Sequence, residues 1–238
     1  MLFRSGATVM LAGMTHHAGQ YVSGIECQGS ATINLVEGTT NDLTHGHESA
    51  YCGIIVLAGT LTIDGTGTLV ASGGWNSAGI GGYNSGNNNK AHIVIDGGNI
   101  TATGGIGGAG IGARHQSSIG DITINGGNVT ATGGTNAAGI GCGYRQGNSS
   151  SCGNITFNGG TVVVNAGANS GWGVGLDSRH DSHYNCGDIK FVGGNVTVNG
   201  EIATKSPYGI YYGEEKQEFT RITPSAQSPF VYPIPATP

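Results

Sequence analysis

The residues best suited to bind a ligand lie in loops that follow four copies of a Gly-Ile-Gly or Gly-Val-Gly signature. Arg145 and Arg179 each lie six residues after the first glycine of their signature and nine before the residue that opens the next strand. We therefore expect them to stack in adjacent repeats. Arg114, in a shorter loop four residues after its glycine, should lie nearby. A guanidinium group binds a carboxylate through two parallel hydrogen bonds, so this stripe predicts a site for an acidic ligand.

Aromatic and imidazole side chains accompany these arginines. His115 and His180 each follow an arginine, and Tyr144 precedes Arg145, where its ring could stack on the face of a sugar. The alternative is that the arginines only cap loop carbonyls or pair with nearby aspartates. The predicted ligand-binding residues are Arg114, His115, Tyr144, Arg145, Arg179 and His180.

One loop, GLDSRHDSHYNCG, also crowds carboxylates and histidines together. Hydrolysis of a glycosidic bond needs two carboxylates that face that bond. Beyond the repeating columns, the candidates for catalysis are the residues of this loop, and loops of this kind are more often solvated or weak metal sites. We therefore expect a protein without catalytic residues, and a polysaccharide lyase or glycoside hydrolase is the minority interpretation. Calcium takes six to eight oxygen ligands, and Asp177 with Asp181 could supply two of them.

Composition limits the class of protein further. Glycine supplies 47 of 238 residues, and charged residues are 10%, against about 25% in typical domains. The net charge of −5 argues against a nucleic-acid partner, because that affinity rests on many phosphate contacts from Lys and Arg. No apolar run approaches the roughly 18 residues of a membrane span. The first twenty residues lack the order of a secretory signal and resemble part of an earlier coil, so we expect the chain to begin inside a repeat array.

The elements that carry the loops recur every 26 to 36 residues, measured between signature glycines from Gly24 to Gly209. Each repeat holds an alternating strand such as Ile122-Thr123-Ile124, then Asp or Asn and usually Gly-Gly, then a second strand. The signature supplies a third strand, with Ile210 as the last member of its column. Repeats of this size cannot bury their own apolar faces and must stack. The pattern predicts a parallel β-helix of about seven coils with three short strands per coil.

The register of the repeats also predicts which columns of stacked residues face inward and which column lies in a turn. The inward ladders are Ile93, Ile122, Ile155 and Ile189, and Ile80, Ile111, Ile140 and Val174. The turn ladder is Asp64, Asp96, Asn125 and Asn158. Cys152 and Cys186 share another column, where stacked Cα atoms about 4.8 Å apart fall within disulfide range, although stacked thiols are the expected state.

The repeat ends before the C-terminus. We predict a β-helix domain over residues 1–213, followed over residues 214–238 by an edge strand and a proline-rich tail. Open ends of a β-helix expose unpaired backbone groups, which permits end-to-end self-association. The segment Phe219 to Pro235 is expected to fold back as a cap over the C-terminal end.

The segment GAGIGA…GDITINGGNVTATGGTNAAGIGCG, from about Ala109 to Gly143, resembles the repeats of Gly-rich right-handed β-helix proteins of anaerobic Gram-positive bacteria. These are called carbohydrate-binding-domain-containing proteins and are related in fold to pectate lyases. The resemblance covers about residues 24–213. It implies an all-β, right-handed parallel β-helix, a secreted or cell-surface location, polysaccharide binding (of acidic glycans in at least one branch) and calcium as a candidate ion.

Two other classes of function fit parts of the sequence. A rod with a proline-rich tail suits a surface stalk or adhesin module. A threonine-rich outer column on the second strand, such as Thr101 and Thr130, is a feature of ice-binding solenoids, but Val70 and Val163 interrupt it here. Threonine is also simply favoured in strands. A non-catalytic polysaccharide-binding protein, secreted or at the cell surface, is the preferred interpretation.

Overall fold

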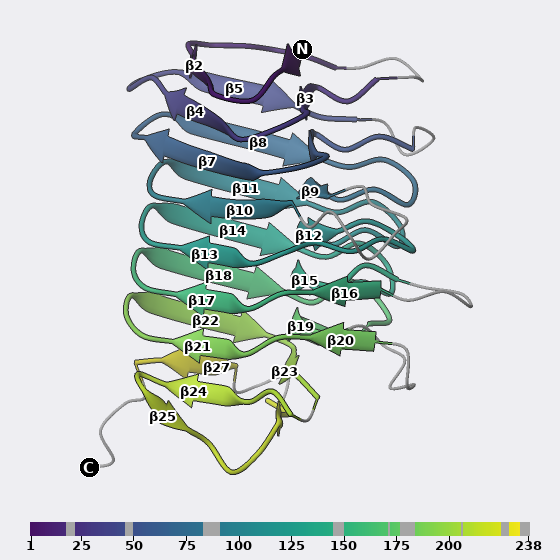
Figure 1. The fold of residues 1–238 in the computed structure, drawn as a ribbon, viewed down its shortest axis with the longest axis vertical. Coiled ribbons are helices and arrows are strands. Elements are labelled where there is room, and N and C mark those ends of the chain that lie inside the picture. Colours follow the sequence, from purple (N-terminus) through teal and green to yellow (C-terminus); the bar gives the residue numbers. More distant parts are fainter. Residues whose placement is uncertain are drawn as a thin grey trace.

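The chain winds into a stack of short strands around one axis (Figure 1). The computed structural model describes residues 1–17, 22–45, 50–82, 91–144, 150–170, 172–176, 184–205, 207–224 and 229–233. Within these ranges it contains strands and turns and no α-helix. The described part accordingly has no helix that could cross a membrane. The predicted all-β parallel β-helix with three strands per coil is confirmed.

Three long sheets form the walls of the β-helix, and a two-stranded sheet lies beside them. Sheet A contains β1 (Leu2–Phe3), β3 (Ile25–Cys27), β6 (Ile54–Val56), β9 (Ile80–Gly82), β12 (Ile111–Ala113), β15 (Ile140–Gly141), β19 (Trp172–Gly175), β23 (Glu201–Ala203) and β26 (Arg221–Ile222). Sheet B contains β2 (Ala7–Leu11), β4 (Ala31–Leu35), β7 (Thr60–Gly65), β10 (His92–Ile95), β13 (Ile122–Ile124), β17 (Ile155–Phe157), β21 (Ile189–Phe191), β24 (Ile210–Tyr212) and β25 (Glu215–Lys216). Sheet C contains β5 (Thr40–Leu43), β8 (Thr68–Ser72), β11 (Asn99–Thr103), β14 (Asn128–Thr132), β18 (Thr161–Asn165), β22 (Asn195–Asn199) and β27 (Phe230–Tyr232). The small sheet pairs β16 (Ser150–Cys152) with β20 (Tyr184–Cys186).

Branched apolar side chains fill the space between the three walls. Ile122 pairs with Ile93 and Ile155 in sheet B, and Ile111 pairs with Ile80 and Ile140 in sheet A. All six are fully buried. Both inward ladders predicted from the alternation are therefore confirmed. Each such side chain contributes roughly 1.5–3 kcal/mol by leaving water, which stabilises neighbouring coils against one another.

The complete coils are fewer than the seven that we predicted. The last signature copy, at Gly209, was assigned to the column of Val174, but Ile210 pairs with Ile189 in sheet B. Ile202 of β23 takes the place beside Val174. The reason is local: Gly200, at φ 140°, turns the chain directly from β22 into sheet A, so the coil is shorter and the signature-like segment arrives one strand later.

A glycine-rich segment crosses the outside of sheet A in the central coils. It leaves no room for side chains, since a Cβ at Gly134 would collide with the carbonyl oxygen of Gly105 in the coil before it. One position in each segment is left-handed, with φ of 59° at Asn76, 78° at Gly107 and 66° at Asn136. This close layer explains why β9 and β12 are buried on both faces.

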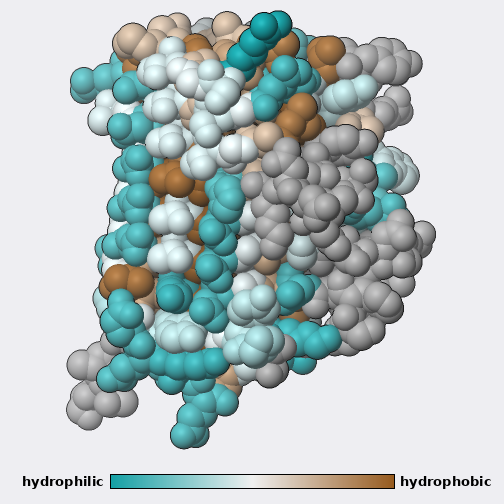
Figure 2. Space-filling model, in the orientation of Figure 1, coloured by the Kyte–Doolittle hydropathy of each residue, from teal (hydrophilic) through white to brown (hydrophobic). Residues whose placement is uncertain are grey.

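Polar ladders mark the turn from sheet B to sheet C. Asn125 donates from its amide to Asp96 Oδ1 at 2.7 Å and accepts from the Asn158 amide at 2.8 Å. These bonds confirm the predicted turn ladder. The same regularity is visible on the outer face of sheet B, where two hydrophilic columns flank a paler one (Figure 2). The middle column is mostly threonine, including Thr123 and Thr156, which lie in register.

The C-terminal strands run antiparallel to the solenoid and lie at its lower end in Figure 1. β25 pairs with β24, β26 with β23 and β27 with β22, one in each sheet. The Phe191 ring meets Phe230 at 4.8 Å and Tyr232 at 5.7 Å between centroids. The expectation that the tail folds back over this end is confirmed for β27.

Candidate ligand-binding edge

Three of the predicted ligand-binding residues lie in the described part of the protein: Arg114, His115 and Tyr144. Arg145, Arg179 and His180 lie outside the described residues, as do the proposed calcium ligands Asp177 and Asp181. Among the residues that the structure does describe, no group of three His, Cys, Asp or Glu side chains is placed to hold a metal ion.

Backbone hydrogen bonds bring residues of successive coils to one edge of the β-helix. His115 donates its N–H to the carbonyl of Asn76 at 3.0 Å. Gln116 donates to the carbonyl of Tyr144 at 3.1 Å, and Tyr144 donates to the carbonyl of Gly107 at 2.8 Å. The turn after β12, the segment after β15 and the glycine-rich segments before them therefore form one continuous surface.

The two rings at this edge contact each other. His115 and Tyr144 lie 5.5 Å apart between centroids and are tilted by 34°. Burial, with a smaller contribution from the Arg114 guanidinium, lowers the pKa of His115. Its imidazole is consequently neutral at physiological pH, and the half-buried Arg114 supplies the charge of this pair. The edge combines a cation with flat, partly exposed rings.

Trp75 belongs to the same surface. It is not among the ligand-binding residues that the sequence predicts. It directly precedes Asn76, and its side chain is 53% exposed. The N–H of Asn76 bonds the carbonyl of Ile106, which is itself 39% exposed. A signal was present, because Trp75 follows Gly73-Gly74 at the position where other repeats have Ile106, Thr135 and Ala168. We call Trp75, Arg114, His115 and Tyr144 the loop-edge cluster.

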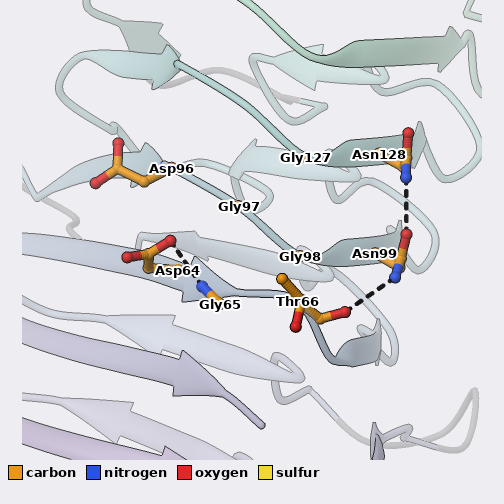
Figure 3. Close-up of a pocket in the computed structure, with 9 residues that line it drawn as sticks. All are labelled: Asp64, Gly65, Thr66, Asp96, Gly97, Gly98, Asn99, Gly127 and Asn128. Atoms are coloured by element: carbon orange, nitrogen blue, oxygen red, sulfur yellow. Dashed lines mark hydrogen bonds between the residues drawn. The ribbon is translucent and has the colours of Figure 1, made fainter. Parts of the chain in front are cut away.

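A concave surface lies at the turn between sheets B and C (Figure 3). This groove of about 420 Å³ has carboxylates on one wall and amides on the other. Asp64 Oδ1 accepts the N–H of Gly65 at 2.7 Å, and the Asn128 amide donates to Asn99 Oδ1 at 2.8 Å. Its lining residues are Asp64, Gly65, Thr66, Asp96, Gly97, Gly98, Asn99, Gly127 and Asn128.

The residues that line this groove stabilise the turn between sheets B and C. Asp64 uses a carboxylate oxygen to hold its own turn and Asp96 uses one to hold the ladder to Asn125, and no aromatic side chain lines the space between the walls. A Cβ at Gly97 would approach Asp64 Oδ1 to 2.9 Å, so glycine is needed at this position because the chains of adjacent coils pass close to each other. The loop-edge cluster is the better candidate for binding.

A family model described as a beta helix repeat matches residues 61–86, 93–113 and 122–144. No match was found among curated proteins or among solved structures. The fold and the repeat match together define a β-helix repeat protein. The matched residues include Trp75 and Tyr144 of the loop-edge cluster, whereas Arg114 and His115 lie between the second and third matched stretches.

Proposed function

We propose that this β-helix repeat protein binds a polysaccharide at its loop edge, without catalysis, at the cell surface or outside the cell. The observation that carries the proposal is the loop-edge cluster. Backbone bonds between successive coils hold an exposed indole, a phenol ring and a guanidinium on one surface. Aromatic rings supply large, rigid contact area that suits the apolar faces of sugars.

An acidic glycan is the ligand class that fits best. The net charge of −5 repels polyanions at long range, so any attraction must be local. Arg114 provides one cation, and Arg145, next to Tyr144 in the chain, and Arg179 would extend the stripe. Bidentate bonds from guanidinium to uronate carboxylates give specificity over neutral sugars.

Affinity electrophoresis in gels with polygalacturonate tests the proposal. The double variant Arg145→Gln with Arg179→Gln should lose most of its retention, because charge-assisted hydrogen bonds are removed. Added salt should also weaken retention of the unmodified protein. Lys190→Gln is the matched control, since it removes one cation from sheet B, where Lys190 lies over the Tyr211 ring. Unchanged retention in the double variant would reject the arginine stripe.

The aromatic contribution can be measured separately. Trp75→Ala and Tyr144→Ala should each reduce retention, whereas Tyr211→Ala on sheet B should not. Gels with and without calcium test the proposed ion at Asp177 and Asp181. Assays for unsaturated and reducing-end products on the same glycan test the non-catalytic part of the proposal, since the release of either product would contradict it.

A surface stalk or adhesin module is the second candidate. It is favoured by the way that β25, β26 and β27 close the three sheets at one end, which makes a rigid rod. That function requires no glycan site. If neither acidic nor neutral glycans retain the protein, the stalk becomes the better explanation.

A further inference from the structure

Three cysteine sulfurs lie in a row beside the candidate edge. Cys152 and Cys186 are directly paired in register between β16 and β20, and their Sγ atoms are 2.6 Å apart. Cys142, just after β15, places its Sγ 3.5 Å from that of Cys152. All three residues are buried, and none of the five cysteines of the chain is bridged in the structure.

In contrast to the stacked thiols expected from the sequence, we propose that Cys152 and Cys186 are the site of a disulfide that cross-links two adjacent coils. Parallel strands in register lie about 4.8 Å apart, within the Cα separation of 4.4–6.8 Å that a disulfide spans. The sulfur–sulfur distance of 2.6 Å is also much nearer to a covalent bond of about 2.05 Å than to a contact between non-bonded sulfurs. Only a small side-chain adjustment separates this pair from a bond.

A shared metal ion does not explain the pair. Two thiolates bound tetrahedrally to zinc at about 2.3 Å hold their sulfurs about 3.8 Å apart. The pair at 2.6 Å is too close for that geometry. Cys142 Sγ lies 3.5 Å from Cys152 Sγ, farther than Cys186 Sγ does, so we assign Cys142 as a thiol beside the disulfide and not as a member of it.

The reaction is thiol–disulfide exchange with a small-molecule disulfide such as oxidised glutathione. The Cys152 thiolate attacks one sulfur of the oxidant, forms a mixed disulfide and releases one thiolate. The Cys186 thiolate then attacks Cys152 Sγ, forms the cross-link and releases the second thiolate. Cys152 and Cys186 each lose one proton and one electron, and the oxidant leaves as two thiols.

Burial determines when this can happen. Cys186 is fully buried, and burial raises its pKa, which keeps the reactive thiolate scarce in the folded protein. We therefore expect the bond to form while the coils assemble and to resist reductants once the protein is folded. The cross-link would tie together the strands that follow the segments carrying Arg145 and Arg179, but it does not depend on glycan binding.

Peptide mapping tests the assignment, because trypsin places the three cysteines in three different peptides. Cys142 lies in 115–145, Cys152 in 146–179 and Cys186 in 180–190. The full chain is refolded with oxidised and reduced glutathione or with reductant alone, alkylated in denaturant and digested. Mass spectrometry should find 146–179 linked to 180–190, lighter by two hydrogens than the separate peptides, only after oxidative refolding.

Two variants complete the test. Cys142→Ser should retain the link between 146–179 and 180–190, whereas Cys186→Ser should abolish it. Reductant in the folding step should lower the urea midpoint of the unmodified protein but leave that of Cys186→Ser unchanged. Alkylated, separate peptides after oxidative refolding would overturn the proposal, and so would a predominant link from 115–145 to 146–179.

Discussion

At the scale of single residues, Ile124 shows how strictly the coil interior is specified. It is fully buried in β13, in register with Ile95 on one side and Phe157 on the other. Replacing it with Asp would place a charge in an apolar column without a partner, at a cost of several kcal/mol. We expect Ile124→Asp to abolish the β-sheet circular dichroism signal and cooperative urea unfolding, since domains are stable by only about 5–15 kcal/mol.

The neighbouring residue provides the control for that experiment. Thr123 lies on the same strand but on its outer face, where it is partly exposed. Thr123→Asp should fold with a midpoint close to that of the unmodified protein. Equal destabilisation by both substitutions would mean that the assignment of inner and outer faces is wrong.

His45 links stability to pH. Its Nε2 accepts the N–H of Gly24 at 3.1 Å, and burial, with a smaller effect of His16, lowers its pKa from 6.5 to about 4. Between pH 6.5 and 4, His45 is therefore protonated in the unfolded state but mostly neutral in the folded state. The free energy of unfolding should be constant above pH 7 and fall by about 1–2 kcal/mol by pH 5.

Urea unfolding at several pH values tests this linkage. His45→Gln keeps an acceptor for the Gly24 N–H but does not titrate, so it should remove most of the fall. His17→Gln, a substitution of an exposed histidine that contacts Asp42, should leave the fall in place. An identical pH profile for His45→Gln and the unmodified protein would contradict the assignment to His45.

At the scale of elements, the glycine-rich segment outside sheet A is as restrictive as the core. A Cβ at Gly134 would collide with the Gly105 carbonyl oxygen, and Gly167 would make the same collision with Gly134. Overpacking typically costs about 1–3 kcal/mol, and a backbone atom cannot rotate away as a side chain can. Gly134→Ala should therefore lose at least about 2 kcal/mol in urea unfolding.

The matching control uses a glycine in open space. Gly38 has a left-handed φ of 71° but no atom near its Cβ position, so Gly38→Asn should change the free energy of unfolding by only a few tenths of a kcal/mol. A tolerated Gly134→Ala would show that adjacent glycine segments can move apart.

The strands could be predicted from the sequence because alternation is a local signal. The alternation of Ile122 and Ile124 identifies the inner face of their strand without information from the rest of the chain. Trp75 carries no such signal alone, since its exposure depends on the glycine layers stacked beside it. Ile210 was misplaced for a related reason: a short turn at Gly200 changed which sheet the next signature-like segment entered.

At the scale of the whole molecule, the C-terminal strands decide what the end of the rod presents to solvent. Phe230 and Tyr232 of β27 cover Phe191, and β27 pairs with the edge of β22. An uncovered edge offers free backbone donors and acceptors to another chain. By covering this edge, the C-terminal cap should prevent the rod from associating end to end with another copy.

Deleting residues 224–238 tests this role of the cap. The truncated protein loses β27 and exposes the edge of β22 together with Phe191, so light scattering should show oligomers whose mass rises with protein concentration. Deleting only residues 234–238 keeps β27 and should leave the protein in the state of the full chain. If both truncated proteins remain monomeric at high concentration, pairing with β27 is not what protects this end. The strands β25 and β26, which pair with sheets B and A, would then be sufficient to close it.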